Sequence, residues 1–170
     1  SQYGDAADQL PAASYKLTYR TGKGRQVYTF CMCPGGLVVP ACSEDKTVVT
    51  NGMSEYARDR ENANSALVVS VSEKDFGKNP LDGVDYQRKL EQKAYELGGG
   101  NYMAPAATVG CFLSGKKGIE IGRVKPSYSI GVSAADFSEL FDRDIVEMLK
   151  IGINRFNKKL PGFATNDAVL

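Results

Sequence analysis

Two thiols stand close together in residues 30–36, which read Phe-Cys-Met-Cys-Pro-Gly-Gly. Side chains alternate between the two faces of an extended strand, so a strand here would place Cys31 and Cys33 on the same face. Two neighbouring thiols can bind a metal or act as a redox pair, and a free cysteine is also often a small buried apolar side chain. Cys31 and Cys33 are therefore the candidate catalytic residues.

The chain has four cysteines in all, and four sulfur atoms would be enough for a structural zinc site. Cys42 and Cys111 are the other two, but the spacing of the four lacks the paired knuckles typical of zinc-binding sequences. Buried packing explains at least three of them more simply, and a disulfide between Cys31 and Cys33 would be strained. No metal site is predicted. A non-catalytic thiol- or metal-binding module stays open as an alternative, as does an interaction domain whose cysteines lie in the core.

Glycines follow the thiols at Gly35 and Gly36, after Pro34. We expect this segment to end one strand in a tight turn, or to let a flat or phosphorylated ligand approach the backbone. Residues 50–54, Thr-Asn-Gly-Met-Ser, are equally ambiguous, because Asn-Gly is typical of a hairpin but a polar segment with helix potential follows. The candidate ligand-binding positions are Gly35, Gly36, Asn51, Gly52 and Ser54, and a polar site beside them could include Arg58, Asn62 and Asn64.

The first half of the chain is predicted to consist of strands. Alternating or β-branched runs occupy residues 15–19, 26–31, 37–39, 46–50 and 66–71, with short connections between them. Five short strands of this kind favour a mainly antiparallel sheet or a small barrel over about residues 13–72. The valine-rich runs predict that at least two strands are covered on both faces.

The second half is predicted to be helical over about residues 82–160. Helices are expected at 82–97, ending at three glycines, and at 104–113, and a capping pattern at 133–136 precedes a short helix. Asp142 can cap a long helix whose core-facing stripe is Ile145, Met148, Leu149, Ile153 and Phe156. Strands followed by helices predict an α+β fold.

The composition is that of one ordinary globular domain of 170 residues, with 42% hydrophobic and 24% charged residues. A formal net charge of +1 gives no field that would attract nucleic acid or an anionic membrane, so neither is an expected partner. Histidine is absent, which removes histidine-based triads and metal sites. The sparse cysteines and the absence of a leader pattern in residues 1–5 predict a cytoplasmic location.

Several blocks of the sequence resemble a known family. Residues 27–36, 49–54 and 62–67 are similar to the signature blocks of bacterial FAD-dependent dehydrogenases, an NAD(P)/FAD-dependent oxidoreductase family of largely uncharacterised substrate. Glu91, Gly98, Gly99 and residues 102–106 resemble the next block. The resemblance extends over almost the whole chain, and it implies that the parent protein is a flavin oxidoreductase.

The same resemblance implies which part of the parent protein binds FAD and which part contacts the substrate. The chain lacks the G-x-G-x-x-G turn of a Rossmann domain, so it resembles an excised inner or C-terminal, substrate-side domain spanning residues 1–170. The FAD-binding Rossmann portion of the same parent chain would hold most of the FAD, and this fragment alone would bind it weakly or not at all. The domain would roof the flavin and shape a pocket for an unknown small-molecule substrate. The candidates for that roof are Cys31, Cys33, Gly35 and Gly36, followed by Asn51, Gly52 and Ser54.

Overall fold

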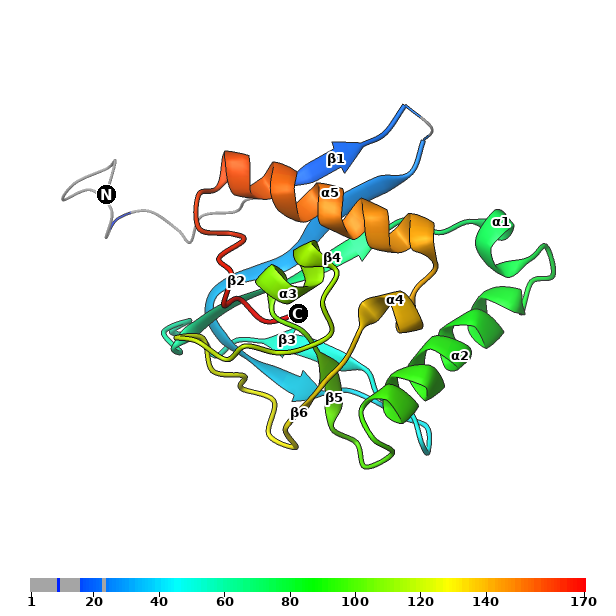
Figure 1. The fold of residues 1–170 in the computed structure, drawn as a ribbon, viewed down its shortest axis with the longest axis horizontal. Coiled ribbons are helices and arrows are strands. Elements are labelled where there is room, and N and C mark those ends of the chain that lie inside the picture. The colour runs from blue at the N-terminus through cyan, green and yellow to red at the C-terminus, as the bar shows by residue number, and fades with distance from the viewer. Residues whose placement is uncertain (1–8, 10–15, 23) are drawn as a thin grey trace.

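The structure is a computed structural model that describes residues 9, 16–22 and 24–170. Strands dominate the first half and helices the second, which confirms the α+β prediction (Figure 1). Residues 13–15, at the start of the expected strand-rich half, lie outside the described residues. No helix in the described part of the chain is long and apolar enough to cross a membrane.

One long strand, β2 (Gln26–Pro40), organises the main sheet. It pairs antiparallel with β1 (Thr18–Arg20) and β4 (Asn62–Val69) along its first part, and with β3 (Thr50–Met53) along its last part. The result is an antiparallel sheet, as predicted, and it does not close into a barrel. Among the described residues it has four strands instead of five, because the predicted strands 26–31 and 37–39 are both parts of β2.

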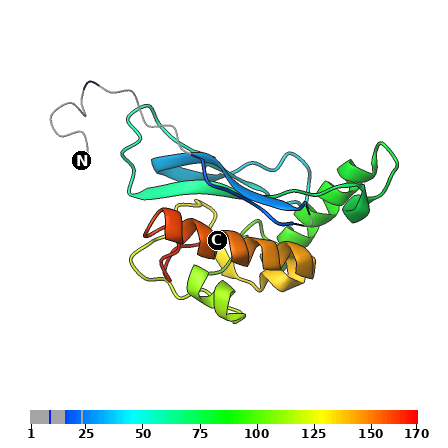
Figure 2. The ribbon, with the colours of Figure 1, turned by 90° about the horizontal axis from the view of Figure 1, so that it is seen from above.

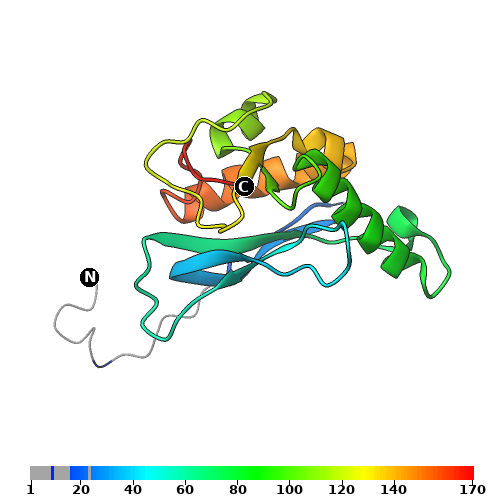
Figure 3. The same cartoon turned by 90° about the horizontal axis from the view of Figure 1, so that it is seen from below.

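The helical layer covers one face of this sheet (Figures 2 and 3). Val27 points into that layer and is fully buried. Phe30, three residues further along and therefore on the other face of the sheet, is 59% exposed. At this position β2 is therefore covered on one face and open on the other.

The predicted turn at Pro34-Gly35-Gly36 does not exist, because these residues continue β2. Between the partners of Phe30, Cys33 and Gly36, β2 twice advances three residues while β4 advances two. Each step is a β-bulge, which inserts one extra residue and bends the strand. Pro34 falls inside the second bulge, where the ladder is already irregular and its missing N–H is tolerated.

Residues 51–53 also differ from expectation. Asn51 and Gly52 lie inside β3, opposite Val39 and Val38, rather than at a hairpin tip. Strand β3 begins at the point where the predicted strand 46–50 was expected to end, and residues 54–60 form a loop with a turn at 56–57 instead of a helix. Pairing with the end of β2 overrides the local turn preference of Asn-Gly.

The second half contains the predicted helix α2 (Asp82–Leu97), which is preceded by a single helical turn, α1 (Glu73–Phe76). Gly99 and Gly100 follow with φ of 100° and 70°, the left-handed conformation expected at a helix end. The predicted helix 104–113 is wrong at its start. Residues Ala104–Ala106 form β5, parallel to β6 (Val132–Ala134), and only Val109–Ser114 form a helix, α3. A residue before proline avoids helical geometry, so Pro105 favours an extended Ala104.

The last two helices begin close to where the sequence predicted, but their caps differ in detail. The predicted capping box 133–136 does not form, because Ser133 lies in β6; Asp136 itself caps α4 (Phe137–Leu140) by accepting a hydrogen bond from the Ser138 N–H at 2.8 Å. Asp142 is the N-cap residue of α5 (Arg143–Lys159), but its side chain makes no capping hydrogen bond. The predicted stripe of α5 faces the sheet, with four of its five residues buried: Ile145, Met148, Ile153 and Phe156. Gly152 permits this approach, since a Cβ there would lie 2.7 Å from a methyl group of Val27.

The C-terminal segment returns to the middle of the molecule. Ala107 and Leu170 exchange two backbone hydrogen bonds, of 3.1 and 2.8 Å, and the Val109 N–H donates to the Ala168 carbonyl at 2.8 Å. Residues 160–170 are thereby held beside β5 and the start of α3, opposite the sheet.

Candidate functional site

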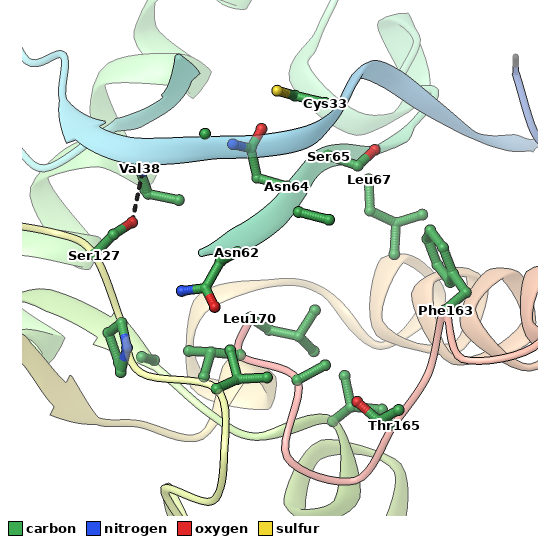
Figure 4. Close-up of a pocket in the computed structure, with 18 of the residues that line it drawn as sticks. Cys33, Val38, Asn62, Asn64, Ser65, Leu67, Ser127, Phe163, Thr165 and Leu170 are labelled. Carbon is green, nitrogen blue, oxygen red and sulfur yellow. Dashed lines mark hydrogen bonds between the residues drawn. The ribbon is translucent and has the colours of Figure 1, made fainter. Parts of the chain in front are cut away.

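A cavity of about 630 Å³ lies between the sheet and the helical layer. Its sheet wall is formed by β2, β3 and β4, and its opposite wall by β5, β6, the loop 124–128, α5 and the C-terminal segment (Figure 4). A volume of this size is in the range of small-molecule sites. Segments more than 130 residues apart in the sequence, such as Cys33 and Thr165, therefore form one site.

Two of the candidate residues predicted from the sequence line this cavity, Cys33 and Gly36. The others, Cys31, Gly35, Asn51, Gly52 and Ser54, are not among its lining residues. The structure therefore brings only part of the predicted set together at the cavity, around the second bulge of β2.

Cys31 and Cys33 do not share a face, contrary to the prediction. Cys31 is exposed and has φ of 48°, a left-handed conformation, whereas Cys33 is buried at 9% exposure. The bulge between Phe30 and Cys33 breaks the regular alternation on which the prediction depended. Only Cys33 is a thiol of the cavity wall.

The glycines of β2 and β3 are explained by contacts within the chain. A Cβ at Gly35 would lie 2.5 Å from the Arg58 carbonyl oxygen, and one at Gly36 would collide with the carbonyl oxygen of Met53. A Cβ at Gly52 would lie 2.6 Å from Oδ1 of Asn64. Glycine is needed at these positions for close packing of the chain itself, and their contact with a cofactor stays a prediction.

The side chain of Asn64 occupies the space beside these glycines. Its Nδ2 would be 2.6 Å from a Cβ at Gly36, and Figure 4 shows the amide directed from β4 toward β2. Oδ1 and Nδ2 are both buried, and neither has a hydrogen-bond partner among the described residues. The sequence marked Asn64 only as one member of a polar segment, because nothing local shows that its amide would be enclosed.

Asn62, two residues earlier on the same strand, is held differently. Its Nδ2 donates a hydrogen bond of 2.6 Å to the Lys125 carbonyl oxygen, which ties β4 to the loop 124–128. In Figure 4 its side chain points toward Leu170, across the cavity. On the same loop, Ser127 Oγ accepts a 2.8 Å hydrogen bond from the Val38 N–H. Arg58, the third residue of the proposed polar site, is not part of the cavity wall.

The inner surface of the cavity carries no charged side chain among the described residues. The two charged lining residues, Glu61 and Lys125, are both exposed. Tyr128 is buried and its hydroxyl donates to the Tyr102 carbonyl oxygen at 3.1 Å. Burial raises the pKa of Tyr128, so its phenol is neutral near pH 7. The chain supplies a neutral, mainly apolar binding surface and no histidine base.

The four cysteines, all of them described, are free and lie in different surroundings. No group of three or more cysteine, aspartate or glutamate side chains in the described part of the chain is arranged to hold a metal ion. The alternative in which Cys31, Cys33, Cys42 and Cys111 bind a metal together is therefore not supported by the geometry.

Comparison with known proteins identifies the family. The family "FAD-dependent protein, C-terminal domain-like" matches residues 1–170. The chain belongs to this family. The resemblance seen in residues 27–36, 49–54 and 62–67 is thereby confirmed at the level of the FAD-dependent family.

This C-terminal domain-like chain also has a curated relative, an uncharacterised protein of Clostridium beijerinckii (strain ATCC 51743 / NCIMB 8052). The two are 49% identical over 174 residues, which cover 100% of this chain and 33% of the relative. The chain thus spans about a third of the length of the relative that it matches.

The cavity of this FAD-dependent family member fits only part of an FAD molecule. Its neutral apolar walls suit an uncharged ring or a substrate next to it. The pyrophosphate of FAD carries negative charge and is normally held by cations or by the N–H groups at the start of a helix. Lys125, an exposed residue, is the one cationic side chain among the described lining residues. Val109 at the start of α3 also lines the cavity, but the N–H groups of Val109 and Gly110 already donate to the carbonyls of Ala168 and Asn166, so the pyrophosphate does not fit here.

Proposed function

We propose that this chain, residues 1–170, is the substrate-side, flavin-covering domain of an FAD-dependent oxidoreductase of the dehydrogenase type. The strand-rich part, about residues 13–72, supplies one wall of the substrate site, and the helical part, about residues 82–160, supplies much of the other. The observation that carries the proposal is the neutral cavity between these parts in a chain of an FAD-dependent family.

The remainder of the parent chain holds the cofactor in this proposal. A Rossmann-type portion binds the adenine and pyrophosphate, which the cavity does not suit. FAD, when bound, supplies the electron-accepting chemistry. Residues of this chain exclude water and position the substrate, with Cys33 and Gly36 on the wall and Tyr128 as a neutral, hydrogen-bonded part of the opposite side.

A tryptophan placed at the cavity tests whether the cavity meets the flavin. The chain has no tryptophan, and an indole close to a flavin quenches its fluorescence by electron transfer. In the full-length flavoprotein, Val124→Trp puts the indole on the cavity wall, whereas Leu81→Trp puts it just before α2, at a position that is 67% exposed. We expect the flavin fluorescence lifetime to shorten several-fold in the first variant and to stay unchanged in the second.

Two results would contradict the proposal. A folded Val124→Trp protein with its full FAD content and an unchanged lifetime would show that the cavity lies away from the flavin. A full-length protein that contains no flavin when it is purified and takes up none would contradict the oxidoreductase proposal itself.

A further inference from the structure

The charge distribution of the cavity limits what it can bind. Glu61 and Lys125 are exposed, and the surface between them and the core is apolar or neutral. Val38 and Leu67 stand on the sheet wall, and Val132 and Leu170 on the other. Moving an ionised group from water into such surroundings without an opposite charge is strongly unfavourable, so a charged ligand would be rejected.

One polar atom is positioned to receive a ligand group. The Asn62 amide is fixed by its hydrogen bond to the Lys125 carbonyl, which requires Nδ2 to face that carbonyl. Oδ1 then points away from the loop, and it accepts no hydrogen bond from a described residue. An amide oxygen held in this way is an acceptor, and its complement is an O–H or N–H donor.

Asn64 is not suited to the same task in this structure. Its two polar atoms are enclosed against Gly36 and Gly52, so a molecule in the cavity does not reach them. The two asparagines of β4 can therefore serve as test and control, because one amide faces the cavity and the other is enclosed beside it.

We infer that the substrate of this site is an uncharged, mainly hydrocarbon molecule with one hydroxyl or N–H group, which donates a hydrogen bond to Oδ1 of Asn62. The inference rests on the proposed function, because it takes the cavity to be the substrate side of a flavoprotein. It adds the chemical class of the substrate and the residue that orients it.

The charge selectivity can be measured on the unmodified full-length protein with two probes that share a ring system. N-phenyl-1-naphthylamine is neutral, and 1-anilino-8-naphthalenesulfonate differs from it by one sulfonate. Equilibrium dialysis should give one neutral probe per chain, bound at least tenfold more tightly than the anionic probe. The Val124→Trp variant should weaken the neutral probe several-fold and so locate it in the cavity. Equal or tighter binding of the anionic probe, or no binding of the neutral one, would overturn the inference.

The role of Asn62 is tested with a second pair of probes, 2-naphthol and 2-methoxynaphthalene, of which only the first is a donor. We expect the unmodified protein to prefer 2-naphthol by about five- to tenfold, which corresponds to one hydrogen bond. Asn62→Leu should abolish this preference, and Asn64→Leu should keep it. A preference that survives in folded Asn62→Leu, or disappears equally in both variants, would refute the assignment of Asn62.

The two proposals fail in different ways. Probe binding is measured without any flavin signal, and flavin content and lifetime are measured without any probe. If the cavity binds the neutral donor but the indole of Val124→Trp leaves the flavin lifetime unchanged, the proposed function alone is contradicted. A quenched flavin beside a cavity that prefers the anionic probe would contradict this inference alone.

Discussion

Asn62 and Asn64 have the same side chain and lie two residues apart on β4, yet their amides should affect the stability of the protein in opposite ways. The Asn62 amide has a partner in the Lys125 carbonyl, whereas the Asn64 amide is buried and has none in the part of the chain that the structure describes. A hydrogen bond typically stabilises a protein by about 1 kcal/mol, and a buried polar group without a partner costs about 1–3 kcal/mol. Similar substitutions at the two positions should therefore change stability in opposite directions.

Asn64→Leu is expected to raise the free energy of unfolding by about 1 kcal/mol, because leucine has a similar shape and no unpaired amide. Asn62→Leu is the control, and it should lower the free energy of unfolding by about 1 kcal/mol. Urea denaturation of the two variants beside the unmodified protein measures both effects. If Asn64→Leu destabilises as much as Asn62→Leu does, the Asn64 amide has a partner in solution.

The two thiols of residues 31 and 33 should differ in reactivity. Cys31 is exposed on the first bulge of β2, whereas Cys33 and Cys111 are buried. Alkylation with iodoacetamide, followed by peptide mapping, should modify Cys31 at least about tenfold faster than the two buried thiols, because reagent access limits the reaction. Cys31→Ser should remove the fast site and leave the slow ones. Equal rates at Cys31 and Cys33 would contradict the different exposure of the two thiols.

At the scale of elements, an ion pair joins the start of β2 to the short helix α1. Arg25 contacts Asp75 at 2.6 Å and also donates to the Ser70 carbonyl oxygen at 2.8 Å. The hydrogen bond from Arg25 is the main reason that the pKa of Asp75 lies below its usual value. A group whose pKa is lowered by folding stabilises the protein above its unfolded pKa, near 4, and loses that effect as the pH falls through its folded pKa.

Arg25→Met should therefore lower the free energy of unfolding by about 1–2 kcal/mol at pH 7, as expected for charge-assisted hydrogen bonds that are mostly buried. The difference from the unmodified protein should shrink as the pH falls below about 4, where Asp75 becomes protonated. Arg88→Met is the matched control. Its pair with Glu44 is half exposed, and its removal should cost less than about 0.5 kcal/mol. A deficit in Arg25→Met that stays constant from pH 7 to pH 2 would contradict the role of Asp75.

The elements also show which sequence patterns are informative. Helix α2 was predicted with its observed bounds, and the stripe of α5 faces the core as predicted, because helical spacing of apolar residues is a local property. The strand β5 was predicted as helix. Its conformation depends on pairing with β6, almost 30 residues away, and residues 104–106 alone do not show that partner.

At the scale of the whole molecule, the cavity needs both halves of the chain. Cys33 and Gly36 come from the bulged part of β2, and Thr165 and Leu170 come from the returning C-terminal segment. The α5 stripe holds the helical layer against the sheet, and the Ala107–Leu170 hydrogen bonds hold the last residues in place. A single packed arrangement therefore positions the site.

The cavity charge also predicts how the isolated chain behaves toward the cofactor. Residues 1–170 expressed alone should be colourless and should keep no FAD through gel filtration, because the cavity does not suit the pyrophosphate. The full-length parent should be yellow and hold about one FAD per chain. A yellow fragment that keeps stoichiometric flavin would show that this chain binds FAD by itself.

The sequence by itself determined the family, the strand-then-helix order and the helices α2 and α5, because motif identity and apolar periodicity are carried by neighbouring residues. It also pointed to Cys33 and Gly36, both of which line the cavity. Only the tertiary structure decided that Pro34-Gly35-Gly36 continues a strand, that Cys31 and Cys33 face different surroundings, and that Asn62 faces the cavity while Asn64 is enclosed. These features depend on bulges in the pairing of β2 with β4 and on contacts with the loop 124–128, and such contacts join residues that are far apart in the chain.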